Sequence, residues 1–353
     1  MRELTIGKTR GLQQLSNTKG IFTICSVDHR RSLRKMMGNG NVSSITYQHL
    51  VDFKLDICEA LASHASGVLL DPIYGASQAI AANVIPGQTG LLVSLEAADC
   101  DSYGDEGQSC ELLTEWSIGK VKAMGASAVK LPLYYRPDLP NVASEHLNAV
   151  IKSAYDCKSL DLAIFVGPRN YIVKELERDP WEFARKKSTL AVDTAYQLSR
   201  LPVDVLKVEF PADVAYERDE QKMLDMCHQL NEASVVPWVL LSGGVGFDVF
   251  KKQLEIACKA GASGFLAGRA LWQEAASLPS RLRFKFLEST AVERLQELSD
   301  MADAYGKSWY HKLEASNNYL YPDFNEEWSQ NILTQKLLPN EKTADLVDRT
   351  LPS

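Results

Sequence analysis

A lysine interrupts one of the most apolar stretches of the chain. Lys207 lies within Val203–Phe210, a run of β-type residues. A buried ammonium group is costly unless it is paired, so a lysine placed there suggests a use. Desolvation and a neighbouring cation both lower the pKa of a lysine, which frees the neutral amine needed to attack a carbonyl carbon. The resulting iminium is an electron sink that permits cleavage of a carbon–carbon bond. With a period of two, Glu209 shares a face with Lys207, so a structural ion pair is the alternative.

Other charged residues stand at or near the ends of apolar runs. Asp28 ends the first run, His29 and Arg30 follow it directly, and Lys130 lies within the fourth run. In a parallel barrel, inward side chains of even-numbered strands share layers, so Lys130 and Lys207 are expected to approach each other. Asp28 is a candidate site residue because it stands at the carboxyl end of the first run. The alternative is a solvated charge run that continues along a helix. Two more runs end on Asp71 and Glu96.

A glycine-rich segment and an arginine form a candidate phosphate site. Ser242 ends the seventh run and Gly243 and Gly244 follow it, while Gly268 and Arg269 follow the eighth run. Exposed backbone N–H groups and a guanidinium at these two positions are typical of the place where barrels bind phosphate. The alternative is that the glycines only form a tight turn.

Several kinds of chemistry find no support. The six histidines show no His-x-His or His-Glu-x-x-His spacing, and no cysteine lies at ligand spacing from them, so no metal or other cofactor is expected. No Gly-x-Ser-x-Gly elbow, phosphate-binding P-loop or dinucleotide-binding fingerprint is present. The seven cysteines are scattered and odd in number, which indicates free thiols in a reducing compartment.

Short apolar runs alternate with helix-period segments over residues 20–270, and this alternation is the signature of repeated βα units. Eight nearly continuous apolar strands favour a parallel sheet covered on both faces, and therefore an α/β fold of the (β/α)8 (TIM) barrel type. A doubly wound sheet is the alternative. The eight runs are Ile21–Asp28, Gly67–Asp71, Gly90–Glu96, Ala128–Leu133, Leu162–Val166, Val203–Phe210, Pro237–Ser242 and Ser263–Ala267.

The remaining composition limits the class of protein. The chain has 353 residues, 45% hydrophobic and 24% charged, with a net charge of −7, so neither nucleic acid nor anionic lipid is an expected partner. Residues 1–17 carry charges and lack the apolar core of a signal peptide, and no stretch is long enough to cross a membrane. A cytoplasmic protein is expected. After residue 270 the pattern becomes helical, so we expect a barrel with a helical extension over 1–315 and a tail over 316–353, docked or partly extended.

Taken together, seven segments resemble the class I tagatose 1,6-bisphosphate aldolase family, in the same order over roughly residues 20–315. The series is more specific than any one of its motifs. These segments are Val27-Asp28-His29-Arg30, Leu70-Asp71-Pro72-Ile73-Tyr74-Gly75, Glu115-Trp116-Ser117, Val129-Lys130-Leu131-Pro132-Leu133-Tyr134-Tyr135, Leu206-Lys207-Val208-Glu209-Phe210-Pro211, Leu241-Ser242-Gly243-Gly244-Val245 and Ala267-Gly268-Arg269-Ala270-Leu271-Trp272-Gln273.

The resemblance implies a metal-independent aldolase that cleaves a ketose 1,6-bisphosphate into dihydroxyacetone phosphate and glyceraldehyde 3-phosphate through a lysine Schiff base. Lys207 matches the Schiff-base lysine. Asp28 would position or deprotonate the C4 hydroxyl, and Lys130 would contact the reacting hydroxyls. Ser242, Gly243 and Arg269 would hold a phosphate. A homo-oligomer is a further expectation from the resemblance.

The sequence departs from the family pattern at the end of the fifth run. Family members usually carry there a glutamate that donates and accepts a proton, and Gly167 takes its place in this chain. Loss of a general acid–base can cost on the order of 10²- to 10⁴-fold in rate unless Glu209, Glu96 or water substitutes. His29, where glutamine is frequent, and Pro132 are smaller departures. The chain is therefore expected to be an aldolase for this or a related sulfonated or deoxygenated ketose phosphate, or a catalytically weakened sugar-phosphate-binding protein.

Overall fold

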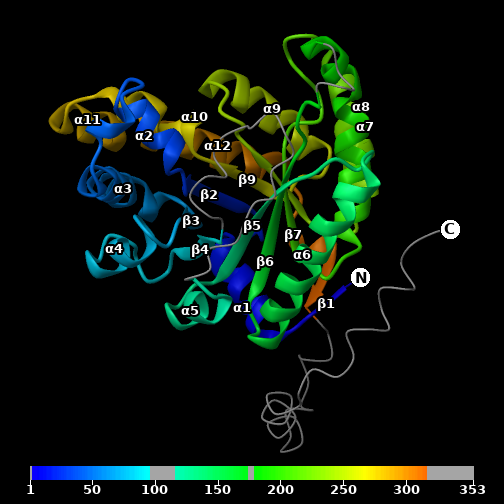
Figure 1. Ribbon diagram of the computed structural model, residues 1–353, viewed down its shortest axis with the longest axis horizontal. Helices are drawn as coiled ribbons and strands as arrows, with labels where there is room; N and C mark the ends of the chain where they lie inside the picture. Colours follow the sequence, from blue (N-terminus) through cyan, green and yellow to red (C-terminus); the bar gives the residue numbers. More distant parts are fainter. Residues whose placement is uncertain (1, 96–115, 174–178, 316–353) are drawn as a thin grey trace, which may run out of the picture. The chain divides into compact units, whose positions relative to one another are not determined.

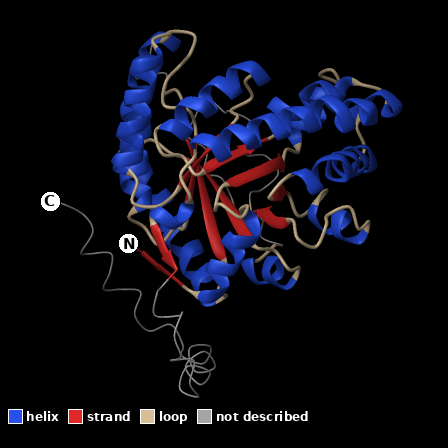
Figure 2. Ribbon diagram, turned by 180° about the vertical axis from the view of Figure 1, so that it is seen from behind, coloured by secondary structure: helices blue, strands red, loops and turns tan. Residues whose placement is uncertain are grey.

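Eight parallel strands close into a barrel in the computed structural model, which describes residues 2–95, 116–173 and 179–315. Figure 1 and Figure 2 show the strands in the middle, with helices around them. In chain order, which is also their order around the barrel, the strands are β2 (Phe22–Val27), β3 (Gly67–Leu70), β4 (Gly90–Ser94), β5 (Ala128–Tyr134), β6 (Ala163–Arg169), β7 (Val205–Val208), β8 (Trp238–Leu241) and β9 (Gly264–Ala267).

Helices follow the strands and bury one face against them, since each strand is apolar on both sides. The barrel closes where β2 pairs with β9, as in the partners Phe22 and Gly264. The helices are α1 (Ile6–Leu15), α2 (Arg31–Met37), α3 (Tyr47–Leu61), α4 (Ala76–Ala81), α5 (Ile118–Ala123), α6 (Pro140–Ser159), α7 (Pro180–Ser199), α8 (Glu220–Ala233), α9 (Phe247–Lys259), α10 (Arg269–Trp272), α11 (Ser280–Phe286) and α12 (Val292–Tyr305).

The predicted α/β barrel and its eight strands are confirmed, and the observed ends of β6 and β7 differ from expectation in ways that affect the site. β6 continues three residues past Val166, through Gly167 and Pro168 to Arg169. Beyond Val166, β6 keeps its pairing with β5, and no further pair with β7 is formed. A proline is tolerated on such a one-sided strand because its missing N–H costs no ladder hydrogen bond. β7 is shorter than expected and ends at Val208.

The helical C-terminal extension is also confirmed. α11 and α12 are joined by a π-helical turn, Leu287–Ala291, and α12 buries Leu295, Leu298 and Ala302. Contacts divide the chain into Met1–Glu314 and Ala315–Ser353, and the predicted tail, 316–353, lies outside the described residues. Strand β1 (Arg2–Leu4) pairs with β10 (Leu313–Ala315).

Two sequence expectations concern cysteines and membrane spans. In the described ranges, the five cysteines are free and buried, and Cys100 and Cys110 fall outside those ranges. None of the helices described is long and apolar enough to cross a bilayer.

Candidate active site

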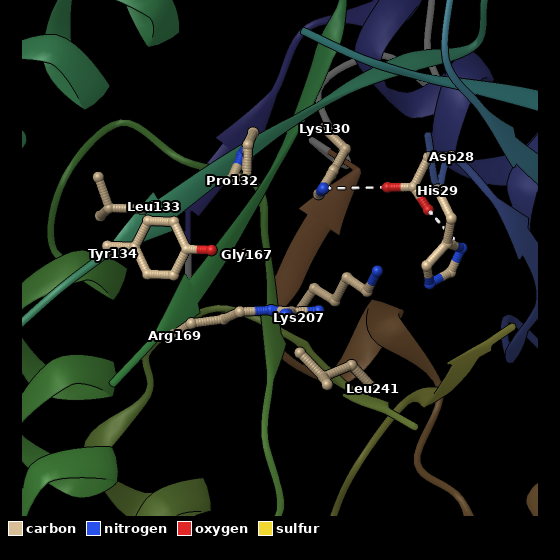
Figure 3. A pocket seen from close by; sticks show the side chains of 10 residues that line it. All are labelled: Asp28, His29, Lys130, Pro132, Leu133, Tyr134, Gly167, Arg169, Lys207 and Leu241. Carbon is tan, nitrogen blue, oxygen red and sulfur yellow. Dashed lines mark hydrogen bonds and ion pairs between the residues drawn. The ribbon is translucent and has the colours of Figure 1, made fainter. Parts of the chain in front are cut away.

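A cavity of about 520 Å³, open to solvent, lies at the carboxyl ends of the barrel strands. The residues that line it come from strands β5, β6, β7 and β8 and from the segment just after β2 (Figure 3). This is the end of the barrel at which enzymes with this fold carry their active sites. The described lining residues are Asp28, His29, Lys130, Pro132, Leu133, Tyr134, Gly167, Arg169, Lys207 and Leu241.

Lys207 reaches this cavity from β7 and is only 6% exposed. The hydrocarbon stem of the lysine is thus enclosed by the barrel, and Figure 3 shows its amine pointing into the cavity. An amine that is largely withdrawn from bulk water and faces a cavity is placed to meet a bound carbonyl group.

Asp28 and Lys130 form an ion pair across the cavity. Lys130 Nζ donates to Asp28 Oδ2 at 3.0 Å and to Ser94 Oγ at 3.4 Å, and all three residues are buried. Burial by itself raises the pKa of Asp28, but Lys130, Lys207 and His29 outweigh it and hold the pKa well below its usual range. Asp28 is therefore a carboxylate in this site, ready to accept a proton.

His29 lies against Asp28 and the wall of the cavity. Its Nδ1 atom is 3.9 Å from Asp28 Oδ1, and its ring meets the Trp272 ring edge-on at 5.2 Å between centroids. Trp272 Nε1 donates to the carbonyl oxygen of Ser26 at 3.1 Å, which ties the wall to β2. Arg30 is buried just before α2 and is not among the lining residues.

A second buried ion pair holds the end of β2 in place. Lys54, from α3, is fully buried; it donates to Val27 O at 2.6 Å and to the carboxylate of Asp71. Asp71 also accepts from the backbone N–H groups of Ile73 and Tyr74. Asp71 is thus structural: with Lys54 it fixes the residue that precedes Asp28.

The predicted phosphate-site residues are brought together after β8 and β9. Gly243 and Gly244 adopt φ values of +59° and +88°, where a side chain would be strained. A Cβ on Gly244 would lie 2.8 Å from Arg269 Cζ, so glycine allows the guanidinium to lie directly against the turn. The Gly268 N–H points to Ser242 Oγ at 3.4 Å. Phosphate binding by this group stays a prediction.

Glu209 lies away from the cavity that contains Lys207. Because β7 ends at Val208, the alternation that would have turned Glu209 inward does not reach it. Glu209 instead lines a second, small cavity together with Pro168 and Lys187. Glu209 is therefore not among the described residues that line the cavity of Lys207. Glu96, the other carboxylate considered, lies outside the described residues.

Gly167 faces the two lysines of the cavity. A Cβ added there would lie 3.6 Å from Lys130 Cε and 3.8 Å from Lys207 Cδ, which are ordinary contacts. The backbone therefore places position 167 where a carboxylate could reach both amines, but the glycine supplies none.

Sequence reasoning did not single out four lining residues, Leu133, Tyr134, Arg169 and Leu241. Tyr134 and Arg169 end β5 and β6, and Leu241 ends β8. A period of two from Lys130 would have found Tyr134, because positions 130, 132 and 134 share a face. Arg169 was hidden because Gly167-Pro168 suggested that the strand had ended.

No group of three or more histidine, cysteine, aspartate or glutamate side chains is arranged to hold a metal ion in the ranges that the structure covers. The polar groups of the described cavity lining are amines, a guanidinium, an imidazole, a carboxylate and a phenol. Amine and carboxylate together are suited to condensation with a carbonyl and to proton transfer.

Comparisons with known proteins agree with this arrangement. A family model of the DeoC/LacD family aldolases matches residues 22–274. Tagatose 1,6-diphosphate aldolase of Listeria monocytogenes serotype 4a is 30% identical over 334 residues, 88% of this chain and 96% of that one. The enzyme of the same name from Staphylococcus haemolyticus is 31% identical, and the match covers 86% of this chain and 98% of that one. The fold, the cavity and these relatives define a lyase of the aldolase class. The chain belongs to the DeoC/LacD family of aldolases.

Solved structures support the fold. A fructose-bisphosphate aldolase from Plasmodium falciparum superposes with a TM-score of 0.65 at 15% identity, covering 87% of this chain and 98% of the other. A Schiff-base-forming fructose-1,6-bisphosphate aldolase superposes with a TM-score of 0.52 at 19% sequence identity. The match covers 80% of this chain and 98% of the other.

Proposed function

We propose that this aldolase is metal-independent and cleaves a ketose 1,6-bisphosphate of the tagatose or fructose type through a Schiff base on Lys207. The products are dihydroxyacetone phosphate and glyceraldehyde 3-phosphate. The observation that carries the proposal is the buried Lys207 amine, which shares one cavity with the Asp28–Lys130 ion pair. The names of the relatives support the choice of substrate.

The proposed reaction begins with addition of the neutral Lys207 amine to the C2 ketone. Loss of water gives a protonated imine. Asp28 then accepts the proton of the C4 hydroxyl, and the C3–C4 bond breaks. Its electron pair moves toward the iminium nitrogen to form an enamine, and glyceraldehyde 3-phosphate leaves as the aldehyde. Lys130, beside Asp28, stabilises negative charge that develops on the C4 oxygen.

The enamine must then gain a proton at C3 before the imine is hydrolysed to dihydroxyacetone phosphate and free Lys207. The glutamate that the family resemblance led us to expect is replaced by Gly167, and Glu209 is directed elsewhere. We propose that water supplies this proton, and that the hydroxide left behind takes up the proton held by Asp28, which restores the carboxylate and a water molecule. The space beside Gly167 adjoins both lysines and opens to the cavity, which supports access by water.

The proposal is tested by trapping the imine. The protein is incubated with saturating dihydroxyacetone phosphate and borohydride, and the modified residue is located by mass spectrometry. The expected result is a reduced adduct on Lys207, and none on Lys207→Met. The exposed Lys222 is the matched control, because Lys222→Met should leave trapping unchanged. An unmodified Lys207 under saturating ligand would contradict the proposal.

A second candidate function is a sugar-phosphate-binding protein with weakened catalysis. Gly167 is the observation that favours it, because the proton-transfer group expected there is absent. Turnover of wild type and Gly167→Glu with a ketose 1,6-bisphosphate decides between the two. Wild-type turnover of about 1 per second or faster rejects the binding-only function. Negligible wild-type turnover that Gly167→Glu raises by 100-fold or more supports it.

A third candidate keeps the reaction and changes the substrate to a sulfonated or deoxygenated ketose phosphate. The departures at His29 and Pro132, both of which line the cavity, favour this candidate. A panel of such substrates, compared by kcat/KM, tests it.

A further inference from the structure

An arginine that none of the catalytic steps uses faces the cavity. Arg169 is the last residue of β6 and lines the cavity with Gly167, two positions before it on the same face. Figure 3 shows its side chain extending toward Lys207. The backbone that carries it is fixed, because Arg169 O accepts from Tyr135 N at 2.9 Å and pairs with Tyr134 in the register of β5 and β6.

The order of the strands places Arg169 and the predicted phosphate site on opposite sides of Lys207. Lys207 is on β7, which lies between β6 and β8. Ser242, Gly243 and Gly244 follow β8, whereas Arg169 ends β6. A ketose whose C2 atom is bound to Lys207 and whose C1 phosphate lies at the β8 turn must therefore extend its other carbons toward β6 or toward the mouth.

We propose that Arg169 is a specificity-determining residue that binds a tetrahedral oxyanion at the far end of the substrate. This inference rests on the proposed function, and it narrows the substrate to ketose 1-phosphates that carry a second phosphate or a sulfonate on the terminal carbon. Arginine suits this role because its planar fork binds such an anion through two parallel N–H···O bonds.

Gly167 supports the same assignment. A Cβ there would contact the stems of Lys130 and Lys207, so a longer acidic side chain would lie among the cations of the cavity and on the same face as Arg169. Such a carboxylate would attract the guanidinium and repel an anionic substrate group. Glycine avoids this competition. A glycine at position 167 and an arginine at position 169 thus both favour an anionic ligand.

The test compares substrates that differ only at the far end. The ratio of kcat/KM for a ketose 1,6-bisphosphate to that for the ketose 1-phosphate is measured in wild type and Arg169→Gln. Because a hydrogen bond to a charged group contributes about 1.5–3 kcal/mol, the ratio should fall by roughly 10- to 100-fold. Arg169→Lys should recover part of the loss, since lysine restores the charge but not the fork.

The matched control is Arg200→Gln, which removes the same charge outside the cavity. Arg200 is exposed at the end of α7 and stacks on the Tyr196 ring. In Arg200→Gln the ratio of the two kcat/KM values should stay at that of wild type. If Arg169→Gln leaves the ratio within twofold of wild type, or lowers it no more than Arg200→Gln does, the assignment is wrong.

Failure of this inference can be told apart from failure of the proposed function. Dihydroxyacetone phosphate lacks the far end, so borohydride should still trap it on Lys207 in Arg169→Gln. If wild type itself is not trapped, the proposed function fails. Calorimetric binding of the bisphosphate and the 1-phosphate to Lys207→Met, with and without Arg169→Gln, then still decides the role of Arg169.

A second arm separates the two kinds of oxyanion. A 6-deoxy-6-sulfonate ketose 1-phosphate is compared with the 1,6-bisphosphate in wild type and Arg169→Gln. For both substrates, kcat/KM should fall in Arg169→Gln by a similar factor. The substrate with the larger kcat/KM in wild type identifies the preferred oxyanion. If kcat/KM falls for neither substrate, the assignment is wrong.

Discussion

The amine of Lys130 and the carboxylate of Asp28 lie 3.0 Å apart, although 102 positions separate the two residues in the chain. Their contact joins β5 to the end of β2 across the barrel mouth. Lys207 also acts on Asp28 through its charge, so the proposed nucleophile, the proposed base and the second lysine form one electrostatic unit. A change at one member should therefore alter the ionisation of the others.

Replacing Lys130 with methionine should impair both stability and turnover. Asp28 would keep its burial but lose its closest cation, and breaking a buried pair in this way costs about 3–5 kcal/mol. The free energy of unfolding, measured by urea titration, should fall by about that amount or less, because Lys207 and His29 still face the carboxylate. We expect kcat to fall roughly 10²- to 10³-fold, as when one donor to developing negative charge is removed. The double variant Lys130→Met/Asp28→Asn should regain stability; an equal or greater loss would contradict the pairing.

The pH dependence of kcat/KM should contain no ionisation of Asp28 between about pH 5 and 8, because the cations hold its pKa well below the ordinary value of about 3.9. In Lys130→Met, one of those cations is gone, so the pKa of Asp28 should rise and the acid limb of the profile should move to higher pH. An unchanged acid limb in the variant would show that Lys130 does not control this carboxylate.

The same lowered pKa makes a prediction about acid stability. A carboxyl group with a lower pKa in the folded state stabilises the protein above its unfolded pKa, and this contribution is lost as pH falls through the folded pKa. The difference in melting temperature between wild type and Asp28→Asn should therefore narrow below about pH 4. A constant difference down to acidic pH would contradict the lowered pKa.

Lys54→Met should reduce stability and turnover although Lys54 does not line the cavity. The substitution leaves Asp71 buried with no ammonium beside it and removes the bond to Val27 O. A loss of about 3–5 kcal/mol in the free energy of unfolding is expected. Because the end of β2 positions Asp28, kcat should fall more than KM changes. In Lys54→Met/Asp71→Asn, an amide oxygen can still accept from Ile73 and Tyr74, so stability should partly return. If stability does not recover in the double variant, the unpaired charge of Asp71 is not the cause of the loss in Lys54→Met.

Gly244→Ala should weaken binding of phosphorylated substrates. The added methyl group would lie 2.8 Å from Arg269 Cζ at a backbone φ of +88°, so the guanidinium must move. We expect KM to rise roughly 10- to 100-fold, the loss of a hydrogen bond between charged groups. Gly246→Ala is the matched control, because a Cβ there would meet nothing within 4 Å and φ is −65°. Equal effects of the two substitutions would argue against a phosphate cradle at this turn.

Local sequence patterns predict much of the barrel framework. The eight apolar runs predict the barrel, since each strand is buried on both faces and each lies next to a helix-period segment. Lys207 and Lys130 stand out because a charge is rare in such a run, and Asp28 because it ends one. These three do meet in one cavity. Gly243 and Gly244 mark a tight turn, and both adopt positive φ.

Local sequence patterns do not predict where strands end or which distant strands contact each other. Only the tertiary structure decides these features. A period of two says which residues of a strand share a face, but not where pairing with the neighbouring strand stops. For that reason Glu209, just beyond the end of β7, is directed away from the cavity, and Arg169, past a Gly-Pro pair, is directed into it. The amino-acid sequence identified the candidate reacting groups Lys207, Lys130 and Asp28. Long-range packing determined which of them face one another, because the register and length of each strand depend on its partners in the closed barrel.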